Sequence, residues 1–351
     1  MKIKNKKFFL SLVIFFFIIS VFKIISIFFS SQNSSESSKF FRVVSISVPK
    51  SINFANENVP IHNPKVLDLL KKEFSYNSFW DSQLKLFYQR SYYWFPMIEK
   101  ILKNENIPDD FKYLAVVESG LVNNKMQRTG AAGFWQFIPT TAQNYGLIVN
   151  ENLDERYDLE KSTYAACRYF KDAYKLLGSY TLVAASYNMG INGIQRKIKQ
   201  QDNQNYYDLI LSKETSKYLF RALAAKTLLS NPRKYGVIIK KNQLLKQIET
   251  KKLFVDSTVT NIEKFAQFYN MNINDFLLFN PWYVGHTIVS NKNKKSKILI
   301  PVNPNYKKIL VNFGFIFQNP ISQNTKQIKD SIKELQQIKD TTQIKNEQKE
   351  S

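Results

Sequence analysis

The feature that most constrains the fold is a long stretch of helical periodicity between residues 64 and 236. Apolar residues recur there three and four positions apart, most clearly from Asp158 to Leu177, a segment that starts with Asp158 and Glu160 and precedes Gly178. This spacing places apolar side chains on one helix face, and acidic starts and glycine ends are typical of helix termini. Pro96 is expected to start or kink a helix that runs to about Asn104. The sequence predicts a mainly α domain over residues 64–237.

The first thirty residues have a different character. Met1 to Lys7 are rich in lysine, and Phe8 to Phe29 are almost wholly apolar. A basic start followed by an apolar run is typical of a secretion signal or an N-terminal membrane anchor. We therefore expect residues 1–30 to be a signal peptide or membrane anchor, and the rest to be exported to the periplasm or cell envelope. Residues 31–63, rich in Ser and Asn, are predicted to be a linker.

A second, smaller domain is predicted over residues 250–303. Its pattern reads strand, helix, helix, strand: Phe254 lies in the first strand, Phe265 in the first helix and Ile298 in the closing strand. The order predicts a small α+β domain after the helical one. Residues 304–351 consist largely of Gln, Lys, Asn and Ser, and we expect them to be a low-complexity tail.

The chain is strongly basic, with 50 Lys and Arg against 28 Asp and Glu and a formal net charge of +22. Such an excess is typical of nucleic-acid-binding proteins, but most of it lies outside residues 105–236, and no arginine-rich helix or aromatic–basic pattern occurs. We expect no specific nucleic-acid binding. One Cys rules out a disulfide within the chain, and two His give no basis for a zinc cluster. The sequence contains no sign of a metal or organic cofactor.

Glu118 is the candidate catalytic residue. It follows the apolar run Tyr113 to Val117 and precedes Ser119 and Gly120 at a predicted helix end. The negative end of the helix dipole and apolar neighbours both favour the protonated form of a carboxyl group. A carboxylic acid kept neutral can act as a general acid. By position alone, a surface glutamate at a helix end remains the alternative.

The neighbouring motifs favour the first interpretation. Glu118-Ser119-Gly120, Gly133-Phe134-Trp135-Gln136 and Ser186-Tyr187-Asn188-Met189-Gly190, taken in order, resemble the motifs of the lytic transglycosylases, a family with a goose-lysozyme-like domain. The segments Arg90–Pro96, Asp154–Asp158 and Glu214–Tyr218 also fit and point to its membrane-bound branch. The resemblance covers about residues 64–237. Four positions depart from the family pattern, mainly in side-chain size: Phe134, Ser186, Met189 and Leu219.

The resemblance implies a lysozyme-like helical fold and cleavage of the β-1,4 bond between N-acetylmuramic acid and N-acetylglucosamine in peptidoglycan. Glu118 would protonate the leaving oxygen and then take the proton of the muramic acid 6-hydroxyl, which closes a 1,6-anhydro ring. Tyr187 is expected to help orient Glu118. Asp154 and Asp158 are predicted to cap and brace helices, and a second catalytic carboxylate is the alternative role for them. The residues expected to contact the substrate are Ser119, Gln136, Tyr187, Asn188 and Tyr218.

The segment 255–301 resembles the LysM-like module that follows this domain in related enzymes. Asp256–Val259, Asn280-Pro281 and Ile298–Pro301 carry the likeness, which is degenerate, with an irregular insert at His286–Asn293. Glycan binding and a packing role without ligand both remain open for this module.

Other functions also remain open at this point. A hydrolytic lysozyme of the same fold would use the same residues but consume water. A non-catalytic peptidoglycan-binding scaffold would have the fold without the chemistry of Glu118. The basic flanks leave a nucleic-acid binder as a third alternative, which steep salt dependence of DNA binding would reveal.

Overall fold

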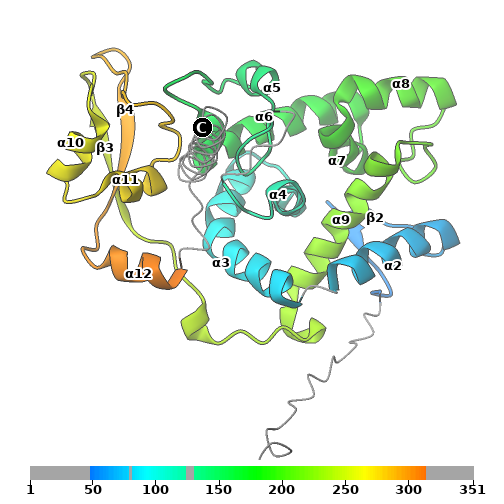
Figure 1. Ribbon diagram of the computed structural model, residues 1–351. Coiled ribbons are helices and arrows are strands. Elements are labelled where there is room, and N and C mark those ends of the chain that lie inside the picture. The colour runs from blue at the N-terminus through cyan, green and yellow to red at the C-terminus, as the bar shows by residue number, and fades with distance from the viewer. Residues whose placement is uncertain (1–47, 79–80, 124–129, 314–351) are drawn as a thin grey trace, which may run out of the picture. The chain divides into compact units, whose positions relative to one another are not determined.

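The computed structural model describes residues 48–78, 81–123 and 130–313 (Figure 1). The predicted signal peptide or anchor, most of the predicted linker and most of the predicted tail lie outside these ranges. Within the described ranges, no helix combines the length and apolar character needed to cross a bilayer.

Residues 64–237 form a helical body, which confirms the predicted mainly α class. Helix α4 lies among the other helices, in contact with α3 and α9, and its residues Leu114 and Ala115 are fully buried (Figure 1). The helices are α2 (Pro64–Ser78), α3 (Asp81–Asn104), α4 (Lys112–Ser119), α5 (Pro139–Asn144), α6 (Leu159–Leu177), α7 (Tyr180–Met189), α8 (Ile191–Gln201) and α9 (Lys213–Ser230). Short 3-10 turns are η1 (Asp109–Phe111), η2 (Glu155–Tyr157), η3 (Pro232–Tyr235) and η4 (Lys241–Gln243).

The helix boundary expected at Pro96 is absent. Helix α3 runs from Asp81 to Asn104 with Pro96 inside it. Pro96 is exposed, whereas Phe95 and Ile98 beside it are buried in the core. A proline inside a helix removes one backbone hydrogen bond. Burial of the apolar face on both sides compensates for that loss and keeps the helix continuous.

The last part of the predicted linker is folded, which corrects that prediction. Strands β1 (Asn53–Phe54) and β2 (Glu57–Asn58) form an antiparallel hairpin. Phe54 is fully buried and packs edge-on against Phe111 at 5.2 Å between ring centroids. The backbone N–H of Ala55 donates to Asp110 Oδ2 at 2.7 Å. Two-residue strands are too short to give a periodic signal, so the sequence pattern did not reveal them.

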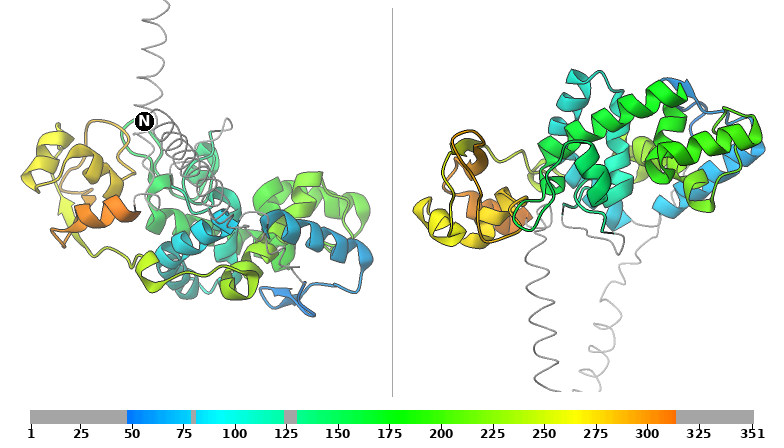
Figure 2. Two further views of the ribbon diagram at one scale, coloured as in Figure 1. Left: turned by 60° about the horizontal axis from the view of Figure 1, so that its bottom comes forward. Right: turned by 90° about the horizontal axis from the view of Figure 1, so that it is seen from above.

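The C-terminal module has the predicted strand–helix–helix–strand order. Strands β3 (Thr250–Val255) and β4 (Ser296–Pro301) pair antiparallel with Thr250 opposite Pro301, and helices α10 (Ile262–Phe268) and α11 (Ile273–Phe279) lie between them in sequence (Figure 2). A further helix, α12 (Tyr306–Phe313), occupies the start of the predicted tail. Tyr306 is buried there, 5.6 Å from the ring of Phe279. The tail prediction is therefore wrong for residues 306–313.

The module and the helical body share a hydrophobic core. Ala132 and Tyr157 of the body are buried in the same cluster as Phe276, Trp282 and Ile298 of the module. The two parts are thus packed together within the described unit that starts at residue 46.

Candidate active site

Glu118 lies in the last turn of α4 and is half-buried. The helix ends at Ser119, and Gly120 follows in the left-handed region at φ 60°, with its N–H donating to Val116 O. A side chain at Gly120 would place a Cβ 2.8 Å from the ring of Phe87. The predicted glycine end of this helix is confirmed, and it fixes where the chain turns away from Glu118.

Tyr218 of α9 contacts Glu118 directly. Its hydroxyl donates a hydrogen bond to Glu118 Oε1 at 2.5 Å. Tyr218 is only 2% exposed. Burial and, secondly, the negative charge of Glu118 raise the pKa of Tyr218 well above its usual value. The hydroxyl therefore stays protonated and remains a donor to the carboxyl group.

Tyr187 of α7 is hydrogen-bonded to the loop that carries Gln136. Its hydroxyl donates to the backbone carbonyl of Trp135 at 2.8 Å. Burial and then the charge of Glu118 raise the pKa of Tyr187 well above its usual value, so the two side chains are electrostatic neighbours. Tyr187 thus holds this loop in place, and its expected help in orienting Glu118 stays a prediction.

That loop also has an unusual backbone. Gln136 adopts a left-handed conformation, φ 50°, and is buried, with its Nε2 donating to Gly133 O at 2.8 Å. Gly133 has φ 80°, and an added Cβ would stand 2.0 Å from the carbonyl oxygen of Arg156. Only glycine fits at this position, which explains the glycine of the motif.

Asn188 is exposed near the end of α7. Its Oδ1 accepts a hydrogen bond from the hydroxyl of Thr215 at 2.8 Å. Thr215 lies one helical turn before Tyr218, so a single face of α9 supplies the partner of Asn188 and the partner of Glu118. Sequence reasoning did not single out Thr215, although it stands within the Glu214–Tyr218 segment quoted above.

Ser119 is placed differently from the other predicted site residues. It is buried, and its hydroxyl donates to Ala115 O at 3.0 Å and accepts from the N–H of Leu121 at 3.1 Å. Both contacts are local, and they brace the end of α4.

The structure thus brings Glu118, Tyr218, Tyr187, Gln136 and Asn188 into one linked group, with Ser119 in the supporting backbone.

Comparison with known proteins identifies this arrangement. The family model described as "Transglycosylase SLT domain" matches residues 95–210, a range that includes Glu118, Gln136, Tyr187 and Asn188. Residues 95–210 are therefore similar to a transglycosylase SLT domain. Two relatives, each named membrane-bound lytic murein transglycosylase D, come from Escherichia coli K12 and Escherichia coli O6:H1. Each is 29% identical over 192 residues, which make up 53% of this chain and 42% of the relative. The match thus spans less than half of each relative.

The size departures in the SLT motifs are absorbed by packing. Phe134 is buried and meets Trp94 edge-on, with ring centroids 5.0 Å apart. The hydroxyl of Ser186 is satisfied by Val183 O at 2.8 Å. Trp135, in the same motif as Phe134, is fully buried and donates from Nε1 to Thr163 Oγ1 at 2.9 Å.

A buried ion pair clamps the SLT loop in place. Arg156 Nε and Nη2 donate to the two carboxylate oxygens of Asp154 at 2.9 and 2.6 Å, and Nη1 donates to Gly130 O at 2.6 Å and Phe137 O at 3.0 Å. Asp158 caps α6 by accepting from the N–H of Lys161. The predicted bracing role of Asp154 and Asp158 agrees with these contacts. Such two-pronged charged hydrogen bonds are among the strongest in proteins.

Glu57 supports the SLT domain from outside the matched range. Its carboxylate accepts from Ser179 Oγ at 2.8 Å, from the N–H of Thr181 at 3.0 Å and from the N–H of Tyr180. These groups form the start of α7, where a negative charge is favourable. Sequence reasoning missed this contact because Glu57 and Tyr180 are separated by 123 positions.

No group of three or more His, Cys, Asp or Glu side chains suited to hold a metal ion occurs among the residues that the structure describes. Cys167 is buried in α6, and burial raises the pKa of its thiol to about 12. A buried thiol of this kind packs as a small apolar side chain.

Proposed function

We propose that this protein is a peptidoglycan lytic transglycosylase that cleaves the β-1,4 bond between N-acetylmuramic acid and N-acetylglucosamine and leaves 1,6-anhydro-muramic acid ends. The observation that carries the proposal is the hydrogen bond between Tyr218 and Glu118 at the end of a buried helix of an SLT domain. The names of the two relatives, murein transglycosylases, support the same substrate.

Glu118 acts first as the acid. It donates its proton to the glycosidic oxygen, the bond to the anomeric carbon breaks, and the carboxyl group becomes a carboxylate. The hydroxyl of Tyr218 donates to Oε1 throughout, and a hydrogen bond to a charged acceptor is stronger than one to a neutral acceptor. Tyr218 therefore stabilises the charge as it develops. In this proposal Tyr218 positions Glu118, and the buried ring leaves little surface for a sugar.

Glu118 acts next as the base. The carboxylate takes the proton of the muramic acid 6-hydroxyl, whose oxygen attacks the anomeric carbon and closes the anhydro ring. The carboxyl group is protonated again, and no water is consumed. Glycosidases commonly use two carboxylates, whereas substrate-assisted ones use the acetamido group of the sugar. Asp154 and Asp158 are engaged by Arg156 and Lys297, which supports the substrate-assisted route.

Gln136 and Asn188 are proposed to contact the sugars. Amide side chains offer both donors and acceptors, which suits hydroxyl and acetamido groups. Asn188 is exposed and held through its Oδ1 by Thr215, so its orientation is set before substrate binds. Tyr187 contributes by fixing the backbone at Trp135, next to Gln136.

The sequence and the relatives' names support a location in the cell envelope. We propose that residues 1–30 export the protein and anchor it, or are cleaved, so that the SLT domain works in the cell envelope. We also propose that the C-terminal module is LysM-like. The proposed partners of the whole protein are the glycan strands of peptidoglycan, and no specific nucleic acid is expected.

Digestion of purified peptidoglycan by the wild type and by Glu118→Gln tests the proposal. Mass spectrometry of the products distinguishes an anhydro end from a reducing end by the mass of one water. Anhydro products from the wild type alone are expected. Reducing ends would establish the hydrolytic lysozyme instead. If neither protein releases fragments yet both bind the wall equally, the chain is a scaffold.

A further inference from the structure

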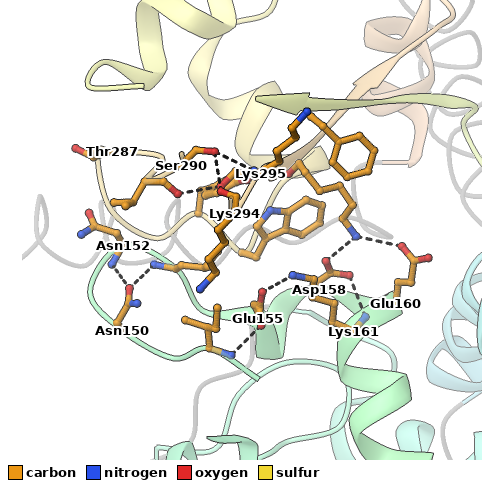
Figure 3. Close-up of a pocket in the computed structure, with 18 of the residues that line it drawn as sticks. Asn150, Asn152, Glu155, Asp158, Glu160, Lys161, Thr287, Ser290, Lys294 and Lys295 are labelled. Atoms are coloured by element: carbon orange, nitrogen blue, oxygen red, sulfur yellow. Dashed lines mark hydrogen bonds and ion pairs between the residues drawn. The ribbon is translucent and has the colours of Figure 1, made fainter. Parts of the chain in front are cut away.

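A cavity of about 940 Å³ lies between the SLT domain and the C-terminal module. Figure 3 shows its two walls: Asn150, Asn152, Glu155, Asp158, Glu160 and Lys161 line the SLT side, and Thr287, Ser290, Lys294 and Lys295 line the module side. None of the residues assigned to the cleavage site lines it. The module wall includes part of the segment 286–293, which the sequence marked only as an irregular insert, and continues through Lys294 and Lys295.

The two walls are held together by specific contacts. The N–H of Asp154 donates to Trp282 O at 2.8 Å, and the N–H of Val284 donates to Asn152 O at 3.1 Å. An added Cβ at Gly285 would stand 2.3 Å from Asn152 Oδ1, so the glycine permits the close approach. The largely buried Lys297 Nζ lies 2.7 Å from Asp158 Oδ2. These contacts fix the distance between the two walls of the cavity.

Among the described residues, the charged groups of the cavity that form no ion pair are the ammonium groups of Lys294 and Lys295 and the exposed carboxylate of Glu151. On the SLT wall, Glu155 pairs with Lys161, and Glu160 pairs with Lys252 and Lys297. Lys294 and Lys295 are exposed at the cavity, and in the part of the chain that the structure describes no carboxylate forms an ion pair with either. Two adjacent ammonium groups of this kind suit a carboxylate.

Apolar surface lies beside these ammonium groups. Phe254 and Val289 line the same cavity and are 61% and 63% exposed. Exposed apolar side chains in a cavity are typical of a binding site, because a bound ligand covers them and removes them from water. A ligand that fills this cavity combines short alkyl groups, amides and at least one free carboxylate.

We propose that this cavity binds the peptide stem of peptidoglycan, with a stem carboxylate on Lys294 and Lys295 and stem alkyl groups on Phe254 and Val289. This inference rests on the proposed function, since peptidoglycan is the polymer that the SLT domain would cut. Stem peptides have free carboxylates and methyl groups, whereas the sugar backbone of the strand presents hydroxyl and acetamido groups. The site thus adds selection for strands whose peptides are still attached.

Isothermal titration of the full chain carrying Glu118→Gln tests the inference, with two probes prepared by amidase treatment: the released stem peptide and the glycan stripped of peptide. The peptide should bind at this cavity, and its affinity should fall as the salt concentration is raised. Lys294→Ala with Lys295→Ala should weaken peptide binding about fivefold, as expected for two exposed charge contacts. The matched control is Lys251→Ala with Lys264→Ala, two exposed lysines of the same module away from the cavity. It should leave peptide binding unchanged.

Three results would overturn the inference: no peptide binding, peptide binding insensitive to the Lys294 and Lys295 changes, or an equal loss in the control pair. Thermal unfolding of each variant establishes that the module is folded. The cleavage assay is separate from this titration. Anhydro products from the wild type together with any of the three results leave the proposed function standing and remove only the peptide site. Absence of cleavage products overturns the proposed function itself.

Discussion

The hydroxyl of Tyr218 donates a hydrogen bond to Glu118 Oε1 at 2.5 Å, although the two residues are 100 positions apart in the sequence. The contact joins the C-terminal end of α4 to the middle of α9. Because Tyr218 is buried and its pKa is raised well above the usual value, the donor keeps its proton at any pH at which the protein is expected to work. The orientation of the carboxyl group is thereby built into the helix packing.

Tyr218→Phe removes this hydrogen bond but keeps the ring. We expect kcat for peptidoglycan cleavage to fall at least about tenfold, since general acid–base catalysis contributes roughly 100-fold or more and depends on placement. KM should change little because the ring is buried away from the sugars. Tyr206→Phe is the matched control: it removes a buried tyrosine hydroxyl that donates to Thr215 O and Ser216 O, with no contact to Glu118. An equal fall of kcat in both variants would contradict the positioning role.

Gly133→Ala should destabilise the protein by about 3–5 kcal/mol, because a left-handed residue acquires a side chain and that side chain overlaps a carbonyl. The overlap is with Arg156 O, 2.0 Å from the added Cβ. Gly178→Ala serves as the control, since Gly178 is also left-handed at φ 69° but an added Cβ meets nothing within 4 Å. Its expected cost is about 1–2 kcal/mol. Urea unfolding of the two variants measures the difference, and similar costs would contradict the overlap.

Glu57→Ala should lower the free energy of unfolding by about 1–2 kcal/mol, the range for loss of a helix cap, because the start of α7 loses a charged acceptor. The effect should reach activity as well, since α7 carries Tyr187 and Asn188. Glu57→Gln keeps an acceptor oxygen and should recover part of the stability. Thermal unfolding together with the cleavage rate checks this. A Glu57→Ala protein as stable as the wild type would show that the cap contributes nothing.

Alkaline pH should unfold the protein. Burial raises the pKa of Tyr93, Tyr157 and Tyr169 to about 12. In the unfolded chain these tyrosines titrate near pH 10, so between about pH 10 and 12 the unfolded state releases protons that the folded state keeps. Stability is then lost as pH rises, by about 1.4 kcal/mol per pH unit for each such tyrosine, and it is unaffected below pH 10. Tyrosinate absorbance followed with circular dichroism tests this: ionisation of these residues before unfolding would contradict it.

The parts of the structure that follow local rules could be predicted from the sequence. Asp158 and Gly178 mark the ends of α6 within a residue, and Gly120 ends α4 as expected. Glu118 could be singled out because an acid after an apolar run is unusual. The family motifs then selected Gln136, Tyr187 and Asn188, which the structure links through Trp135 and Thr215.

The remaining features depend on contacts between distant segments. Nothing local to Glu57 shows that its carboxylate caps α7, and a two-residue strand has no period to detect. The family motifs placed Tyr218 among the substrate contacts, and its hydrogen bond to Glu118 arises because α9 packs on α4. Pro96 indicated a helix start or a kink, and burial of its neighbours keeps α3 continuous through it.

The sharing of a hydrophobic core between the SLT domain and the C-terminal module has a consequence for how the protein can be divided. The family match ends at residue 210, but the residues that hold the site together extend further in both directions. A fragment cut to the matched range would lack Glu57, and the start of α7 would lose a charged acceptor. It would also lack Tyr218, the hydrogen-bond donor from α9 to Glu118. Finally, it would expose Tyr157, which Trp282 and its neighbours cover. The matched segment is thus smaller than the segment whose contacts hold the site together.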